Sequence, residues 1–449
     1  MTQEKTAQGM RAFMTIWLGE LVSIIGSGLT GFALGVWVYQ STGSATLFAL
    51  ISLFTTLPGI LVAPLAGALV DRWDRRMVMF VADTGAALCT LAIATLLWSS
   101  ALEVWHIYIA MGIASLCGAF QQPAYKVAAT LLVPRERFGQ ASGLMQIGNG
   151  AQYIISPVIA GLLVGVVGIK GVVLVDFATY FCAMFALLAV RIPRPAATEA
   201  GSAGRGSIWG EIAQCWHYLR QRSGLLSVIA VLTFGNFMTA FISVLAAPLM
   251  LSFADTAVLG LTMSIAGTGM LIGSIVLGVT GGPKRLIRGM TAAMAAGSLG
   301  MVFMGVRQDA VLITAACFVF FFSMPFVQGC YDTIIRSKVE ADLQGRMFAV
   351  SSGVIQFAAV AAYVLAGPLS EYVFQPMMAQ GGSLAPSVGA LIGAGPGRGI
   401  ALLFIVFGVL ALVVTGLGYA NPHMRNVERE LPDVAPAQPL GEPQLVPAD

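Results

Sequence analysis

Apolar runs of about 20 residues recur along the whole chain, and each is long enough to cross the roughly 30 Å of a bilayer's hydrocarbon as a helix. Hydrophobic residues make up 57% of the sequence and charged residues only 10%, which is not the composition of a water-soluble domain. The predicted fold class is therefore an all-α integral membrane protein with twelve transmembrane helices. The predicted spans are 13–39, 46–70, 77–98, 104–131, 140–168, 171–190, 224–252, 257–280, 287–306, 309–335, 346–373 and 400–419.

Lysines and arginines gather on one side of these predicted helices. Of the 24 in the sequence, only Lys170, Arg307 and Arg398 fall in connections on the other side, and Lys126 falls inside a span. Short basic loops are retained in the cytoplasm during membrane insertion. Both termini are therefore predicted to be cytoplasmic, which agrees with an even number of spans.

A polar connection divides the predicted helices into six and six. It begins RIPRPAATEAGSAGRGS, which is typical of a flexible linker. It ends IWGEIAQCWHYLRQR, whose apolar residues share one helical face; this predicts a helix on the membrane surface or, alternatively, a docking site for a partner. The predicted domains are an N-terminal six-helix bundle at 1–190, a cytoplasmic linker with the interfacial helix at 191–223, a C-terminal six-helix bundle at 224–420 and a disordered cytoplasmic tail at 421–449.

The two predicted bundles resemble each other in sequence. QPAYKVAATLLVPRERFG, which ends at Gly139, aligns with QGCYDTIIRSKVEADLQG, which ends at Gly345, at a constant offset of 206 residues. The same offset places Gly161 on Gly367. The halves are therefore predicted to be diverged copies in parallel orientation, a symmetry typical of transporters built from two bundles.

Three motifs carry a resemblance to a known family. GALVDRWDRR lies between the second and third spans, SPVIAG lies in the fifth, and LLVPRERFGQASGLMQ follows the fourth. Their order and spelling resemble the major facilitator superfamily, in particular permeases of the enterobactin-exporter and macrolide-efflux type, over about residues 1–420. The resemblance implies a bacterial cytoplasmic membrane protein in which spans one, four, seven and ten line a central cavity.

The first motif supplies a predicted conformational latch of Gly67, Asp71, Arg72, Arg75 and Arg76. The glycine allows two helices to approach closely. The acid can pair with the arginines, or the arginines can bind carbonyl groups of a neighbouring helix, and these contacts would break when the cavity opens inward. The alternative is a charged loop that only obeys the positive-inside rule.

The second motif places Ser156, Pro157 and Gly161 in the fifth span. Proline removes a helical hydrogen bond, and small residues permit close helix contact. In the related family this element is associated with antiporters. Small-residue packing without any role in export is the alternative.

Opposite charges occupy equivalent positions of the two repeats, Lys126 in the fourth span and Asp332 in the tenth. One hypothesis is that they pair across the cavity when its cytoplasmic side closes, as a switch rather than a permanent contact. The alternatives are that Lys126 extends toward the cytoplasm and that Asp332 pairs with Arg336, one helical turn away.

Two further acids lie within predicted spans. Glu20 is the first candidate for the proton carrier, because a carboxyl buried in a medium of low dielectric constant holds a proton more readily than one in water. A structural hydrogen bond is the alternative. Asp83 is predicted to pair with the region of Arg75 and Arg76. Candidate substrate contacts, which could equally be bonds between helices, are Gln122, Tyr125, Gln328, Tyr331 and Asn236.

Other classes of protein find no support in the sequence. The six cysteines show no C-x-x-C spacing and the three histidines are scattered, so no metal site is expected. There is no nucleotide-binding G-x-x-x-x-G-K-[ST] motif and no recognisable nucleophile motif, so neither an enzyme nor a cofactor is expected. A net charge of +3 gives no reason to expect nucleic acid as a partner.

These observations predict a secondary transporter that exports small organic molecules, such as siderophores, macrolides or drug-like compounds, in exchange for protons. Transport would follow alternating access of a midplane cavity, in a monomer surrounded by lipid. The alternatives are a proton-coupled importer and a lipid or lysolipid flippase. A mainly apolar cavity with a few polar groups suits several substrates, so the substrate itself is not predicted.

Overall fold

The structure, a computed structural model of the whole chain, describes residues 3–70, 73–134, 137–190, 216–339 and 341–430. Asp71 and Arg72 of the predicted latch, the linker up to residue 215 and the tail from residue 431 lie outside the described residues. Every described element is a helix or a connection between helices. Among the described residues, eleven helices are long and apolar enough to cross a membrane. The predicted all-α membrane fold is confirmed.

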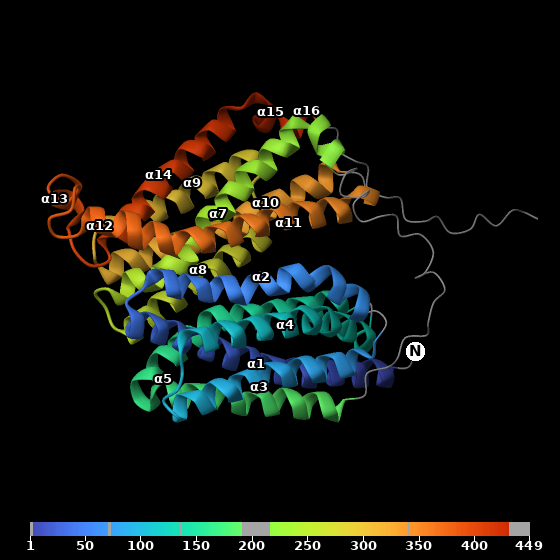
Figure 1. Cartoon of the computed structure of the whole chain (residues 1–449). Coiled ribbons are helices and arrows are strands. Elements are labelled where there is room, and N and C mark those ends of the chain that lie inside the picture. The colour runs from blue at the N-terminus through green and yellow to red at the C-terminus, as the bar shows by residue number, and fades with distance from the viewer. Residues whose placement is uncertain (1–2, 71–72, 135–136, 191–215, 340, 431–449) are drawn as a thin grey trace, which may run out of the picture.

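Five helices make up the first half of the chain (Figure 1). They are α1 Gln3–Thr42, α2 Ala45–Val70, α3 Arg75–Trp98, α4 Val104–Leu132 and α5 Phe138–Ala189. α5 contains two of the predicted spans, because the chain turns at Gly168, which has φ 68° and ψ 176°. Residues with a side chain rarely adopt this conformation. The eleven helices therefore include all twelve predicted spans.

The second half contains six long helices and several short ones. They are α7 Ser223–Leu251, α8 Thr256–Thr280, α9 Leu286–Val306, α10 Ala310–Lys338, α11 Ala341–Pro368, the π-helix η3 Leu369–Phe374, α12 Gln375–Met378, α13 Val388–Ile392, α14 Arg398–Ala420, α15 Pro422–Arg425 and α16 Val427–Glu430. Aspartates begin two of them: Asp255 accepts a hydrogen bond from the Val258 amide at 2.8 Å, and Asp309 from the Leu312 amide at 2.9 Å. These carboxylates satisfy amides that have no partner within the helix.

The long helices run between two ends of the molecule, which we name by their charge. The basic end carries the arginine-rich connections at 70–75, 132–138 and 280–286. The opposite end carries the remaining connections at 42–45, 98–104, 251–256, 306–310 and 374–398, which contain few basic residues. In Figure 1 the N-terminus lies at the basic end, and α12 and α13 lie at the opposite end.

In the part of the chain that the structure describes, the apolar core shared by the two halves lies toward the opposite end. There, Val36, Ala45 and Ala49 of the first half pack in one cluster with residues of α7, α8 and α11. Toward the basic end each half has clusters of its own, one around Tyr125 in the first half and one around Tyr331 in the second. Among the described residues, the halves are therefore joined at the opposite end and share no apolar cluster toward the basic end.

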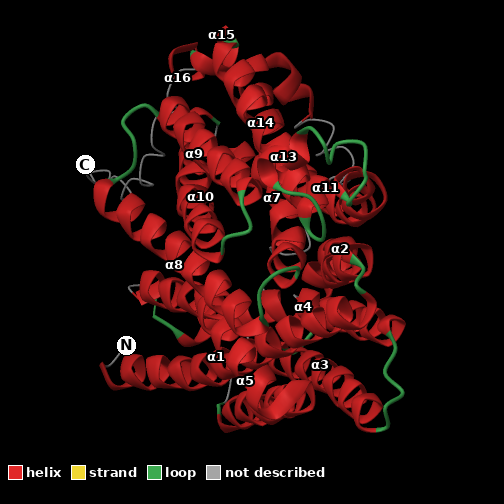
Figure 2. Ribbon diagram, turned by 90° about the vertical axis from the view of Figure 1, so that its left-hand side faces the viewer, coloured by secondary structure: helices red, strands yellow, loops and turns green. Residues whose placement is uncertain are grey.

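Two helix pairs make most of this junction, α2 with α11 and α5 with α8, and α2 also contacts α7 and η3. Figure 2 shows α2 directly beside α11, and α8 between α10 of its own half and the helices of the first half. At the predicted offset of 206 residues α8 is the counterpart of α2 and α11 the counterpart of α5, so the two pairs occupy equivalent positions, as expected for repeated bundles.

The chain after α14 differs from its prediction. A disordered segment was expected from residue 421, but α15 and α16 fold against α7 and α9, with Met424 and Val427 buried. Glu428 accepts a hydrogen bond from the Ile287 amide at 2.9 Å, and its carbonyl accepts one from Lys338 at 2.7 Å. The prediction of disorder is therefore corrected for residues 422–430, because these apolar and charged groups find partners that the Pro-rich composition of the tail does not reveal.

Candidate functional site

The junction of α5 and α8 is a contact between backbones. A Cβ atom at Gly161 would lie 2.8 Å from the Thr256 carbonyl oxygen and 3.5 Å from the Ala257 Cα, and one at Gly260 would meet the carbonyl of Pro157. Ser264 of α8 donates a hydrogen bond to the Ile154 carbonyl of α5 at 2.5 Å. The SPVIAG motif thus lies where the two halves meet.

Ser156 of the same motif faces the other way. It donates a hydrogen bond to the Ile25 carbonyl of α1 at 3.0 Å and is buried. α5 therefore presents Ser156 to its own half and Gly161 to the other half. This placement agrees with close packing by small residues and leaves the antiporter role of the motif a prediction.

A second junction at the opposite end depends on one carboxylate. Glu371, on the π-helix after α11, accepts hydrogen bonds from the Ser44 hydroxyl at 2.7 Å and the Thr46 amide at 3.0 Å. Ser44 and Thr46 lie at the first turn of α2, where the helix dipole favours a negative charge. We call Ser44, Thr46 and Glu371 the clasp, because it joins the first turn of α2 to the other half of the chain.

Glu371→Ala is expected to raise the fraction of molecules that are open at the opposite end about tenfold. The reason is that a hydrogen bond to a charged group contributes about 1.5–3 kcal/mol. The measurement is the labelling rate of a cysteine introduced at Ala359, which is buried in the shared core, in a background without reactive native cysteines. Glu371→Gln, which keeps a carbonyl acceptor, serves as the control and should have a smaller effect. An unchanged labelling rate in Glu371→Ala would contradict the clasp.

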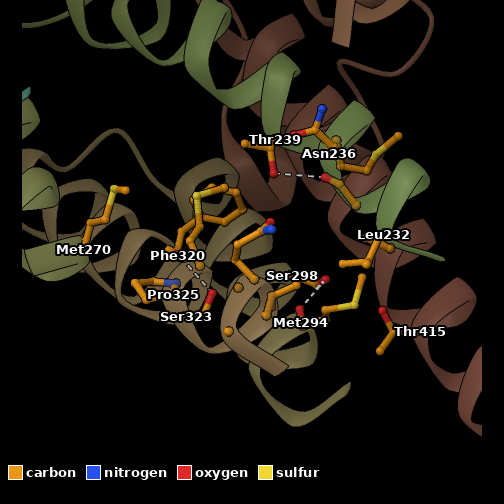
Figure 3. Close-up of a pocket in the computed structure, with 18 of the residues that line it drawn as sticks. Leu232, Asn236, Thr239, Met270, Met294, Ser298, Phe320, Ser323, Pro325 and Thr415 are labelled. Atoms are coloured by element: carbon orange, nitrogen blue, oxygen red, sulfur yellow. Dashed lines mark hydrogen bonds between the residues drawn. The ribbon is translucent and has the colours of Figure 1, made fainter. Parts of the chain in front are cut away.

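A cavity of about 620 Å³ lies in the second half of the chain (Figure 3). It lies among α7, α8, α9, α10, α11 and α14, and its lining includes the methionines 238, 270, 294, 301 and 324. Unbranched, polarizable methionine side chains adapt to ligands of different shape. The polar groups on its wall include Asn236, Thr239, Gln328 and Asp332. The cavity is thus mostly apolar with a few polar groups, as in many small-molecule sites.

The charged residues near this cavity are not paired as the sequence suggested. Asp332 accepts a hydrogen bond from Gln328 at 2.9 Å, and it forms an ion pair with neither Lys126 nor Arg336 in the described structure. Lys126 is exposed on α4 of the other half. The cavity-pair hypothesis concerns a state in which the basic end is closed, so it stays a prediction.

The other candidate contacts divide into two groups. Asn236 and Gln328 line the cavity, and Asn236 also donates a hydrogen bond to the Ile355 carbonyl at 2.8 Å. Tyr331 is buried and binds Ser351 of α11 at 2.5 Å, so it joins helices instead of facing the cavity. In the first half Gln122 is exposed, whereas Tyr125 is buried.

One residue of the predicted latch, Arg76, binds a neighbouring helix. Arg76 donates hydrogen bonds to the carbonyls of Leu187 and Leu188 at 3.2 and 2.7 Å, at the end of α5. Gly67 lies in α2, and Arg75 begins α3. This agrees with the carbonyl contacts that the latch hypothesis allowed. The other contact of the latch hypothesis, an ion pair between Asp71 and the arginines, involves a residue outside the described ones.

Glu20 lies in the interior of the first half. Its carboxylate accepts a hydrogen bond from Gln121 of α4 at 2.8 Å, and only 4% of the residue is exposed. The Oδ2 atom of Asp83 on α3 is buried without a hydrogen-bond partner among the described residues, and the predicted pairing of Asp83 with the region of Arg75 and Arg76 stays a prediction.

The sequence reading did not find the role of Glu371. The available signal was an acid in AGPLSE, near the end of the eleventh span, directly after a glycine and proline. The described residues contain no group of three or more His, Cys, Asp or Glu residues that could hold a metal ion.

Comparison with known proteins matches residues 16–363 to the Major Facilitator Superfamily. The chain is 28% identical over 365 residues to macrolide efflux protein A of Streptococcus pyogenes, covering 80% of this chain and 90% of that protein. It is 25% identical over 373 residues to the multidrug efflux pump Tap of Mycolicibacterium fortuitum, covering 80% and 89%.

Solved structures share the fold at low sequence identity. A mutant of the nucleoside transporter NupG superposes with a TM-score of 0.71 at 11% identity, covering 91% of this chain and 100% of that one. A bacterial homolog of the human lysosomal transporter Spinster, in an inward-facing and unoccupied conformation, superposes with a TM-score of 0.65 at 13% identity, covering 92% and 97%.

Proposed function

The chain belongs to the major facilitator superfamily, and from this premise we propose that it exports small organic molecules across the bacterial cytoplasmic membrane in exchange for protons. It is a multi-pass membrane transporter, not an enzyme. The relatives named as macrolide and multidrug efflux proteins support export over import. We propose that it acts as a monomer.

The cavity in the second half is the observation that carries this proposal. Its volume of about 620 Å³ and its methionine-rich wall suit bulky apolar molecules such as macrolides and drug-like compounds. Asn236, Gln328 and Asp332 provide the few polar groups that would orient a substrate.

We further propose that the basic end faces the cytoplasm, with both termini on that side, as the distribution of lysine and arginine suggests. The halves are joined at the opposite end, so the structure would then be the inward-open state. A substrate would enter the cavity from the cytoplasm and leave after the junctions of α2 with α11 and of α5 with α8 separate.

The test uses inverted membrane vesicles with an acidic interior, in which a transported macrolide, siderophore or cationic dye should trigger proton release. Protein-dependent proton release on substrate addition is the expected result. Substrate movement without proton movement would refute antiport, and movement of labelled lipid alone would favour a flippase.

Thr239→Phe is expected to reduce the apparent affinity for a bulky substrate about tenfold, because Thr239 lies on the cavity wall (Figure 3) and the ring would occupy substrate space. Substrate-concentration curves for a macrolide and for a small dye provide the measurement, and the small dye should be less affected. Val279→Phe introduces the same ring on the exposed surface of α8 and is the control. Equal effects of the two variants would argue against the cavity as the substrate site.

A further inference from the structure

The connection between η3 and α14, at the opposite end, leads into a buried arginine. Arg398 is the first residue of α14, and only 8% of it is exposed. Its guanidinium lies against the backbone of Gly393, where a Cβ atom would be 3.0 Å from Nε and 3.2 Å from Nη2. Gly393 has φ 92°, a conformation that favours glycine, so the backbone at this position leaves the space to the arginine.

Hydrogen bonds of other groups hold this loop in place. Gln375, directly after η3, donates one to the Gly395 carbonyl at 3.0 Å and accepts one from the Gly399 amide at 3.1 Å. A Cβ atom at Gly399 would meet the backbone of Gln375. The backbone amide of Arg398 donates to the Gly395 carbonyl at 3.2 Å. The end of η3 and the start of α14 are thus joined without the side chain of Arg398.

The guanidinium of Arg398 has no protein partner in the described part of the chain. No described residue accepts a hydrogen bond from it or forms an ion pair with it, and its Nη1 atom is buried. A buried charge without a counterion is costly, and arginine does not lose its proton to avoid this cost. The N-terminus of a long helix such as α14 also favours an anion. Both features favour a negatively charged ligand at Arg398.

The position of Arg398 indicates which anion it would meet. It begins the last membrane span, so it lies at the level of the lipid headgroups. Tyr372 of η3 is 68% exposed, and tyrosine is typical of the membrane interface. Leu391 of α13, two residues before Gly393, is 86% exposed and offers an apolar contact for lipid. The planar guanidinium of arginine binds phosphate through two parallel hydrogen bonds.

We propose that Arg398 is the anchor of a phosphate-binding site at the opposite end, which takes the headgroup of a membrane phospholipid or free phosphate. The guanidinium supplies the charge and the paired donors, and the backbone at Gly393 fixes its place. This inference goes beyond the proposed function, and it depends neither on the direction of transport nor on proton coupling.

The test measures the melting temperature of delipidated protein in detergent with three probes: phosphatidylglycerol, a diacylglycerol with the same acyl chains, and inorganic phosphate against sodium chloride of equal ionic strength. Phosphatidylglycerol should raise the melting temperature of the wild type by about 2–4 °C more than diacylglycerol does. Arg398→Gln should lose this difference. Arg398→Lys, which keeps the charge without the paired donors, should retain part of it.

Inorganic phosphate distinguishes the two sources of the ligand. If it stabilises the wild type but not Arg398→Gln, free phosphate is sufficient for the site. If only phosphatidylglycerol does so, the ligand is the lipid headgroup.

Arg307→Gln is the matched control, because Arg307 is an exposed arginine at the same end of the same half. It should respond to all three probes like the wild type. Without any probe, Arg398→Gln should melt no lower than the wild type, since it removes a buried charge that has no partner among the described residues. A lower melting temperature there, an unchanged response of Arg398→Gln to phosphatidylglycerol, or an equal loss in Arg307→Gln would overturn the proposal.

Discussion

Glu20→Gln is expected to abolish uphill export while leaving substrate binding intact. A pH difference of one unit stores about 1.4 kcal/mol per proton, enough to sustain about a tenfold substrate gradient. The amide introduced by Glu20→Gln cannot carry a proton. The ratio of substrate concentrations across the membrane should therefore fall to one, while the substrate still moves down its own concentration gradient. Glu20 does not line the cavity, so substrate affinity should be unchanged.

The measurement compares steady-state substrate accumulation in inverted vesicles with substrate affinity in detergent. Glu103→Gln is the control, because Glu103 is an exposed glutamate at the opposite end, beside the first turn of α4. It should accumulate substrate like the wild type. If Glu20→Gln accumulated substrate as fully as the wild type, Glu20 would not be the residue that carries the proton.

Gly260→Val is the second variant with a large expected effect. A Cβ at Gly260 would meet the Pro157 carbonyl and lie 3.3 Å from the Gly161 Cα, and both are backbone atoms that cannot rotate away. The contact of α5 with α8 should therefore not form, and the state closed at the opposite end should lose much of its population. Because each 1.4 kcal/mol of strain changes this population tenfold, we expect transport to fall by at least about tenfold.

Spin-label distances between α5 and α8 at the opposite end would detect the separation directly, beside the transport rate. Gly165→Val is the matched control. Gly165 lies one turn beyond Gly161 on α5, and nothing lies within 4 Å of the position of its Cβ. Normal transport and unchanged distances in Gly260→Val would show that this contact is not needed for closure.

The fold could be predicted from the sequence because it depends mainly on a local property, the length of each apolar run. The length of each apolar run sets a membrane span, and even the turn at Gly168 falls at the predicted end of the fifth span. The folded segment at 422–430 was missed because Glu428 finds its partner, the Ile287 amide, more than a hundred residues away.

The candidate site was less accessible, because side-chain direction depends on which helices are neighbours. Glu20 could be selected as an unusual buried acid, but its bond to Gln121 follows only from the packing of α1 beside α4. Gln328 and Tyr331 are less than one turn apart, yet only Gln328 lines the cavity.

The buried acids and the cavity lie in different halves of the chain, and no described residue belongs to both. A substrate that fills the cavity therefore need not replace the proton's charge, and the electrical work per cycle varies with the cargo. Export of a neutral molecule for one proton moves a net charge inward and draws about 2.3 kcal/mol from each 100 mV of membrane voltage. Export of a monovalent cation for one proton is electroneutral and draws on the pH gradient alone.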